Sequence, residues 1–316
     1  MKRSILPPMP GVVLSDTVVA RPFLKWAGGK GQLIPAIEAA LPVILHNGDN
    51  ITYVEPFIGS GAVLFRLLQQ YPSIQKAVIN DINPDLVEAY RAIKEQPAKL
   101  IESLGVLQEA YYRLKTTEEK RDFFLARRTE FNNRSADHHT ALLIFLNRTC
   151  YNGLYRVNSR NQFNVPFGTY AKPKICDAAN IMAVSRLLQR VTILNGDYSE
   201  TVRRLPGKVF CYLDPPYKPI SKTASFNSYS KDRFDDAEQR RLREFCDGLT
   251  ARNICWLMSN SDPRNHNPED NFFDDLYAGD ALHIGRVAAR RNINSNASKR
   301  GDIAELLISN YTRGLK

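Results

Sequence analysis

The most informative chemical residues in the chain are Asp214-Pro215-Pro216-Tyr217, which follow the apolar run 209–213. Proline fixes φ and donates no backbone hydrogen bond, so two in succession predict a stiff turn at the carboxyl end of a strand, where α/β proteins bind ligands. The Asp214 carboxylate and the Pro215 carbonyl are two acceptors, which match the two hydrogens of a planar amine such as adenine N6. Tyr217 offers a face on which an extruded base can stack. The alternative is a Pro-Pro turn that only ends a strand.

A second candidate binding feature is the turn that carries Gly59 and Gly61, after the β-branched run 51–54. Glycines at such a turn let the backbone approach a ligand closely. Asp81 ends the next predicted strand, about 20 residues on, where an acid accepts hydrogen bonds from ribose hydroxyls. A nicotinamide cofactor is disfavoured, because Leu64 stands where G-x-G-x-x-G has its third glycine. A plain tight turn is the alternative.

The segment 23–30 carries Lys25, Trp26 and Lys30 around two adjacent glycines. It superficially matches a phosphate-binding P-loop. However, Gly31 follows Lys30 where that motif has Ser or Thr, and no predicted strand leads into the segment. Chemically, the segment is able to place an aromatic ring and an amine over a cofactor carboxylate. A plain surface loop is the alternative interpretation.

A loop-like stretch, 147–174, is rich in Asn, Arg, Tyr and Phe and contains a predicted hairpin. Its arms, 156–158 and 162–165, flank a short polar turn. A two-stranded ribbon fits the major groove of DNA, and arginine, here Arg156, is the usual bidentate reader of guanine. Tyr151 is suited to wedge into the base stack. The alternative is a solvated polar loop.

Other polar groups carry weaker signals. His138 and His139 have no acid or cysteine at metal-ligand spacing, so we expect them on the surface and expect no metal site. Basic residues around the last two predicted strands suit phosphate contacts, or a solvated face. They are Arg286, Arg290, Arg291, Lys299 and Arg300.

These residues need a scaffold, and the pattern of strands and helices predicts an α/β fold with a mixed, mostly parallel sheet. The predicted strands are 51–54, 76–81, 191–194, 209–213, 254–258, 282–287 and 303–309, with helices at 62–70 and 235–249. The stretch 84–146 is charged and helix-patterned, with no clear strand. We therefore divide the chain into a leader (1–20), a main domain (21–83 and 175–316) and an insertion domain (84–174).

Composition narrows the class of protein. The formal charge of +10, from 43 Lys+Arg against 33 Asp+Glu, suits a polyanionic partner such as nucleic acid, although many basic proteins bind none. The five cysteines form no C-x-x-C pair, and their odd number favours a reducing compartment. No apolar run is long enough to span a bilayer, and Pro7, Pro8 and Pro10 interrupt any signal-peptide core. We expect a cytoplasmic protein.

The motifs together resemble a known family. FLKWAGGK (23–30), EPFIGSGA (55–62), NDIN (80–83) and DPPY (214–217) occur in the order of the Dam-type (D12 class) site-specific DNA adenine-N6 methyltransferases, and segments 147–158, 163–168 and 259–262 are also similar. The resemblance runs from about Phe23 to Asn310. It implies a Rossmann-like fold that depends on S-adenosylmethionine (SAM), in which the main domain binds SAM and the helical insertion recognises the DNA target.

The resemblance also implies roles for individual residues. The residues implied to be catalytic are Asp214, Pro215, Pro216 and Tyr217. The residues implied to bind the cofactor are Trp26, Lys30, Phe57, Gly59, Gly61, Asp81, Asp197 and Asp214. The residues implied to bind DNA are Lys25, Tyr151, Asn152, Leu154, Arg156 and Pro166.

The expected reaction moves a methyl group from SAM to adenine N6 in double-stranded DNA at GATC, with base flipping and without a metal, and leaves S-adenosylhomocysteine (SAH). We expect a monomer. One alternative is an RNA or protein-glutamine methyltransferase, although these usually lack the insertion. Another is a catalytically inactive DNA-binding module, against which the intact DPPY motif and Asp81 argue. A solitary enzyme, a restriction-modification partner and a phage enzyme all remain compatible with the sequence.

Overall fold

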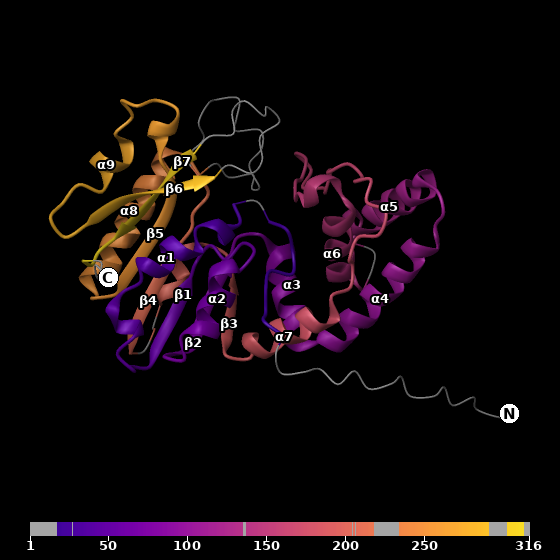
Figure 1. Ribbon diagram of the computed structural model, residues 1–316, viewed down its shortest axis with the longest axis horizontal. Helices are drawn as coiled ribbons and strands as arrows, with labels where there is room; N and C mark the ends of the chain where they lie inside the picture. Colours follow the sequence, from indigo (N-terminus) through magenta and orange to yellow (C-terminus); the bar gives the residue numbers. More distant parts are fainter. Residues whose placement is uncertain are drawn as a thin grey trace.

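The computed structural model describes residues 18–26, 28–134, 137–203, 205, 207–217, 234–290 and 302–312. Within this part of the chain, helices flank a mixed sheet, and a further group of helices stands to one side of it (Figure 1). Most of the predicted leader lies outside the described residues. So do Arg291, Lys299, Arg300 and the side chain of Arg290.

Across the described residues, the sheet has seven strands in the order β3-β2-β1-β4-β5-β7-β6. Strands β1 to β5 run parallel, while β7 pairs antiparallel with both β5 and β6. The strand order reverses between β1 and β4, and such a switch point opens a crevice at the carboxyl ends of the strands. All seven predicted strands are confirmed. Their bounds are β1 Ile51–Glu55, β2 Ile74–Asp81, β3 Val191–Asn195, β4 Lys208–Leu213, β5 Cys255–Ser261, β6 His283–Arg290 and β7 Asp302–Ser309.

Both faces of the sheet are buried, because successive side chains of a strand point to opposite sides. Tyr53, Phe210 and Tyr212 enter one hydrophobic core, and Val54 and Cys211 enter the other. Burial on both faces explains why the central strands are continuous apolar runs in the sequence. The first core continues beyond the sheet into the insertion helices.

Short and medium helices connect the strands. They are α1 (Ile34–Ala39), α2 (Ala62–Gln70), α7 (Ala178–Leu188), α8 (Asp236–Ala251) and α9 (Phe272–Leu276), with 3-10 turns at Lys30–Gln32, Val43–Leu45, Tyr198–Val202 and Pro263–Asn265. Helices α2 and α8 confirm the predicted helices. No helix in the described part of the chain combines the length and apolar character needed to cross a membrane.

The insertion is helical, as predicted. Its elements are α3 (Pro84–Glu95), α4 (Pro97–Arg113), α5 (Thr117–Asn132), α6 (His139–Thr149) and a 3-10 turn at Tyr151–Gly153. Local signals start these helices. Asn83 caps α3 by accepting from the Leu86 N–H, and Thr116 with Glu119 forms a capping box on α5. Helix α3 packs on β2, β3 and α7 as well as on α6, whereas α4, α5 and α6 lie at the right of Figure 1, away from the strands.

Candidate active site

Acidic side chains gather where the parallel strands end. Glu55 ends β1, Asp81 ends β2, Asp197 follows β3 and Asp214 follows β4. Neighbouring parallel strands present their carboxyl ends at the same sheet edge, so residues far apart in sequence meet there. A pocket at this edge is lined by residues of three predicted motifs, among them Gly28, Gly29, Lys30, Glu55, Gly59 and Asp214.

Asp214 is held through one of its two oxygens. The Lys30 Nζ lies 2.8 Å from Oδ1, and the Ser259 hydroxyl donates to the same oxygen at 3.0 Å. Ser259 is itself hydrogen-bonded to Tyr212 at 2.8 Å. Burial raises the pKa of Asp214, while the positive charge of Lys30 and the hydrogen bonds from Lys30 and Ser259 oppose that rise. In the part of the chain that the structure describes, both of these contacts fall on Oδ1.

Tyr217 ends the DPPY turn, residues 214–217, and connects it to β7. Its hydroxyl donates to Glu305 Oε2 at 2.7 Å and accepts a hydrogen bond from Lys30, whose Nζ lies 4.3 Å from the ring centroid. Lys30 therefore lies between Asp214 and Tyr217, at the DPPY turn. Glu305 and Ser259 are not among the predicted site residues, although Ser259 lies in the family-like segment 259–262. A lone acid in the apolar run 303–309 was the available signal for Glu305.

The glycine turn has the backbone that the sequence predicted. Gly59 and Gly61 have φ of 47° and 72°, a region that side chains disfavour. A Cβ on Gly61 would lie 2.5 Å from the Tyr90 hydroxyl oxygen, which donates to the Gly59 carbonyl at 3.0 Å. A Cβ on Gly59 would lie 3.3 Å from Trp26 Cδ1. The turn is therefore a close-fitting cradle with an aromatic ring against it.

Asp81 lies directly behind this cradle. Its Oδ2 accepts from the Gly59 N–H at 3.2 Å and its Oδ1 accepts from the Asn83 N–H at 2.9 Å. Burial raises the pKa of Asp81, and these backbone hydrogen bonds oppose the rise. An acid fixed at this point fits the ribose of an adenosyl cofactor.

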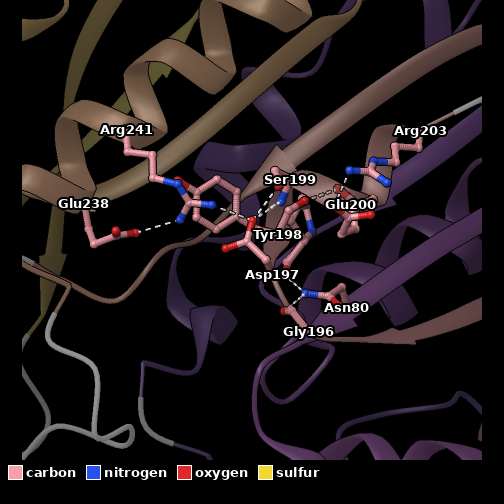
Figure 2. Close-up of polar contacts among 11 residues, drawn as sticks. Asn80, Gly196, Asp197, Tyr198, Ser199, Glu200, Arg203, Glu238 and Arg241 are labelled. Atoms are coloured by element: carbon pink, nitrogen blue, oxygen red, sulfur yellow. Dashed lines mark hydrogen bonds and ion pairs between the residues drawn. The ribbon is translucent and has the colours of Figure 1, made fainter.

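Asp197 lies beside an aromatic cluster at the next strand end. Figure 2 shows its carboxylate with Ser199 and Arg241: Oδ1 accepts from the Ser199 N–H at 3.0 Å and from Arg241 Nη2 at 2.7 Å. Burial acts to raise the pKa of Asp197, but hydrogen bonds from Arg241 and Ser199 outweigh it, so the pKa is lowered.. The Tyr198 ring lies 5.1 Å from Phe57 and 4.7 Å from the Arg241 guanidinium carbon. Phe57 therefore packs against the buried ring of Tyr198, the residue that follows Asp197.

The side chain of Asn80 joins the turn that follows β1 to the turn that follows β3. Asn80 Nδ2 donates to the Pro56 carbonyl at 3.1 Å and to the Gly196 carbonyl at 2.9 Å, the second of which is drawn in Figure 2. Asn80 is buried, so both contacts are shielded from water. It fixes the EPF turn against the turn that carries Asp197. Asn80 and Arg241 are not among the predicted site residues.

The predicted hairpin is confirmed as a short antiparallel pairing. Val157 forms a bridge with Phe163, and the Asn158 N–H donates to the Gln162 carbonyl at 2.9 Å. Arg156 is exposed, and its Nε and Nη2 donate to the Asn164 side chain and carbonyl at 2.7 and 3.2 Å. Asn164 therefore holds the guanidinium in place on the hairpin surface.

The other predicted DNA-contacting residues lie on the same loop or next to it. Tyr151 is 56% exposed, which is unusual for a large aromatic side chain. Leu154 is half-buried. The exposed ones are Lys25, Tyr151, Asn152 and Pro166.

The prediction that His138 and His139 are surface residues is wrong for His139. This side chain is 8% exposed, stacks on Phe131 with ring centroids 4.2 Å apart, and places Nε2 3.2 Å from Asp85 Oδ1. Helix α6 is buried on nearly every side, so a polar residue at its start is drawn inside. A lone histidine in a polar stretch does not reveal this packing.

Three potential metal ligands cluster at that point, but their chemistry does not suit a cation. Ligand atoms of Asp85, Glu88 and His139 lie within 4.8 Å of one another. Asp85 already accepts from Arg134 at 2.6 Å and from the Tyr155 hydroxyl at 3.0 Å. The guanidinium supplies the positive charge that a metal would bring, so we interpret the cluster as an ion-pair network.

Arg286 is not placed as a phosphate contact. Its guanidinium lies 2.6 Å from Asp262 Oδ2 and 2.7 Å from Asp274 Oδ2. Two carboxylates neutralise its charge. It therefore stabilises the edge of the sheet, and the remaining members of the basic cluster lie outside the described side chains.

The strand order and the site geometry define a Rossmann-like methyltransferase. The sequence profile described as D12 class N6 adenine-specific DNA methyltransferase matches residues 26–293, and the chain belongs to this family. It is an SAM-dependent DNA adenine-N6 methyltransferase.

Curated relatives agree with this assignment. The chain is 45% identical over 296 residues to the "Type II methyltransferase M.MjaIII" of Methanocaldococcus jannaschii, which covers 92% of this chain and 99% of the relative. It is 36% identical to the "Type II methyltransferase M1.LlaDCHI" of Lactococcus lactis subsp. cremoris, covering 92% and 95%. It is 33% identical to the "DNA adenine methylase" of Escherichia coli strain K12, covering 91% and 94%.

Proposed function

We propose that this enzyme methylates the adenine of GATC in duplex DNA after flipping that base out of the helix. The observation that carries the proposal is the arrangement around Asp214. Lys30 and Ser259 both bind Oδ1, so Oδ2 and the Pro215 carbonyl remain as two acceptors for the two hydrogens of adenine N6. An adenine inside a duplex cannot reach a turn at the bottom of a pocket, which is why base flipping is required.

Asp214 acts in this proposal by position and charge. Two hydrogen bonds at N6 direct the nitrogen lone pair toward the methyl donor and favour loss of ring conjugation. N6 attacks the electrophilic methyl carbon of SAM in line with the carbon–sulfur bond; the new N–C bond forms as the C–S bond breaks, and sulfur keeps the bonding pair, which leaves SAH. The methylated N6 is then positively charged and acidic, and it loses one proton to solvent water. Asp214 does not act as a strong base, because a neutral amine is a poor acid. Tyr217 supplies a ring for the flipped base.

We propose that residues along the edge of the pocket bind different parts of SAM. We assign Asp81 to the ribose and Asp197 with Phe57 to the adenine, since Asp197 keeps Oδ2 available beside an aromatic ring. Gly59 and Gly61 give the cofactor close access to the backbone, and Trp26 lies over it. Lys30 remains assigned to the cofactor through its place in the same pocket.

We assign DNA recognition to the insertion, residues 84–174. Arg156 reads guanine from the hairpin, and Tyr151 fills the stack beside the extruded base. The other proposed DNA contacts are Lys25, Asn152, Leu154 and Pro166. We further propose that the enzyme works as a monomer in the cytoplasm without a metal. Sedimentation of the protein with and without duplex DNA tests the oligomeric state.

The test is transfer of labelled methyl groups from SAM to duplexes that carry GATC or each single-base variant of it. We expect GATC to be preferred, Asp214→Ala to lose activity while still binding DNA, and Asp247→Ala on the surface of α8 to behave as wild type. A 2-aminopurine at the target position should brighten when the base is extruded. Methylation of another adenine site would contradict the GATC assignment. Activity of Asp214→Ala within tenfold of wild type would contradict the mechanism.

A further inference from the structure

The loop assigned to DNA, residues 147–174, and the segment assigned to the cofactor, residues 23–30, touch each other at several places, among them the contacts of Asn147 and Tyr155. Asn147 accepts from the Lys25 N–H at 2.8 Å and donates to the carbonyls of Lys25 at 2.8 Å and Gly153 at 2.9 Å. The Tyr155 ring stacks on Trp26, with centroids 4.9 Å apart and planes 26° apart. The first contact joins the backbones of Lys25 and Gly153 through the Asn147 side chain, whereas the second joins two side chains directly.

The Tyr155 hydroxyl is anchored on the far side of its ring system. It donates to Asp85 Oδ2 at 3.0 Å, and Asp85 Oδ1 accepts from Arg134 at 2.6 Å and from His139 at 3.2 Å. Asp85 starts α3, Arg134 follows α5, and His139 starts α6. Tyr155 therefore connects the helices of the insertion with the cofactor segment through one side chain.

Tyr155 is next to Arg156 in the chain, and the two side chains point to opposite sides of the hairpin. The backbone is extended at Leu154, and successive side chains of an extended chain point to opposite sides. Tyr155 is 3% exposed while Arg156 faces solvent. A shift of the Tyr155 ring thus moves the backbone that presents Arg156. On the other side, Trp26 lies against Gly59 of the cradle.

We propose that Tyr155 is a positioning residue that couples the cofactor pocket to the DNA-reading hairpin, so that a bound cofactor strengthens DNA binding and DNA strengthens cofactor binding. A ligand on Trp26 restricts that ring, and the stacked Tyr155 is then restricted before DNA arrives. The first ligand to bind bears the entropy cost of ordering these two rings, so the second ligand binds more tightly. Such coupling is reciprocal, because each ligand changes the affinity for the other by the same factor. The inference rests on the proposed function, which assigns Trp26 to the cofactor and Arg156 to DNA.

The coupling factor is the ratio of the dissociation constants of a labelled GATC duplex without and with saturating SAH, measured by fluorescence anisotropy. For wild type we expect a factor in the range of about 5 to 150. Tyr155→Phe keeps the stacked ring and removes the hydroxyl contact to Asp85, so its factor should fall toward one. Tyr112→Phe is the matched control, because it removes a hydroxyl bond to the Pro173 carbonyl in the same insertion without touching Trp26.

Tyr155→Leu provides a second variant that removes the ring itself. It should lose the coupling and also weaken SAH binding, because Trp26 loses its stacking partner. The unfolding midpoint of each variant is measured alongside, so that affinities are compared only well below it.

Three results would overturn the inference: no coupling in wild type, an unchanged factor in Tyr155→Phe, or the same loss in Tyr112→Phe. Base preference of Arg156→Ala is measured in parallel. If Arg156→Ala keeps the wild-type base preference, the proposed readout by Arg156 is contradicted. The coupling inference is still decided by the factors of wild type, Tyr155→Phe and Tyr112→Phe. An altered preference with an unchanged factor in Tyr155→Phe contradicts only the coupling.

Discussion

Among single residues, Asp214 shows how a buried charge is made usable for chemistry. Burying an unpaired carboxylate costs several kcal/mol, so such groups are paired or protonated. Lys30 and Ser259 bind one oxygen of Asp214, and these contacts oppose the rise in its pKa that burial causes. Glu55 provides the contrast: burial raises its pKa well above the usual value, and the Tyr53 hydroxyl at 2.7 Å only partly opposes the rise.

Lys30→Gln should change the pH dependence of turnover. The substitution removes the positive charge that opposes the burial-raised pKa of Asp214, so this pKa rises further. The proposed step needs the ionised carboxylate, hence the acid limb of kcat should move to higher pH. The measurement is kcat against pH at saturating SAM and DNA, with Lys94→Gln, remote from the pocket, as control. An acid limb at the wild-type position would contradict the role given to Lys30.

Gly61→Ala should destabilise the protein and weaken SAM binding. The residue has φ of 72°, and its Cβ would lie 2.5 Å from the Tyr90 hydroxyl oxygen. We expect the free energy of unfolding to fall by about 1–3 kcal/mol. Gly105→Ala in α4 is the control, since its Cβ meets no atom within 4 Å and should add about 0.5–1 kcal/mol. Denaturant unfolding measures both, and equal effects of the same sign would refute the argument.

Among the elements, the hairpin is short and depends on its neighbours for its shape. Its pairing in the described residues is one bridge, between Val157 and Phe163, and the buried ring of Phe163 packs against Tyr155 and against Phe131 of α5. Asn132 adds two hydrogen bonds to the Phe163 backbone, at 2.8 and 3.0 Å. These contacts with α5 lie on the buried side of the hairpin, so they support its backbone while Arg156 remains exposed on the other side.

Arg156→Ala should relax specificity at one base pair. A bidentate contact to guanine discriminates by about 1–3 kcal/mol, so preference should fall roughly 10- to 100-fold at that position while basal methylation persists. Arg160→Ala, at the exposed turn of the same hairpin, should act alike on all sequences. The measurement is kcat/KM on GATC and its single-base variants. A uniform loss in Arg156→Ala would identify a phosphate contact instead.

In the whole molecule, one sheet edge assembles groups from most of the chain. Parallel strands β1 to β4 deliver Glu55, Asp81, Asp197 and Asp214 to that edge, and antiparallel β7 delivers Glu305. The cofactor is therefore expected to contact segments that are joined only through the fold. SAM should therefore bind only the folded protein and raise its free energy of unfolding.

SAM should raise the free energy of unfolding by about 2.7 kcal/mol at 100 times its dissociation constant. Asp81→Ala removes the proposed ribose acceptor and should weaken SAM binding by about 1.5–3 kcal/mol, so most of that stabilisation should disappear at the same concentration. Calorimetry gives the affinity and thermal unfolding gives the stabilisation. Asp247→Ala is the surface control. Unchanged affinity in a folded Asp81→Ala protein would overturn the assignment.

The sequence by itself determined the elements and the motifs. Each of the seven strands in the described residues was predictable, because alternation, β-branched runs and terminal turn residues act within one segment. The order of the motifs predicted which acids end which strands. The helical insertion followed from the long charged pattern of 84–146.

Only the tertiary structure decided which side chains meet. Lys30 lies beside Asp214 and Tyr217, Glu305 accepts from Tyr217, and Asp85 joins three parts of the insertion. None of these pairings follows from local sequence. They depend on which strands are neighbours and on how helices pack, and a short-range pattern of polar and apolar residues carries no information about a partner many residues away. Burial of polar groups is decided in the same way, by packing from several segments at once.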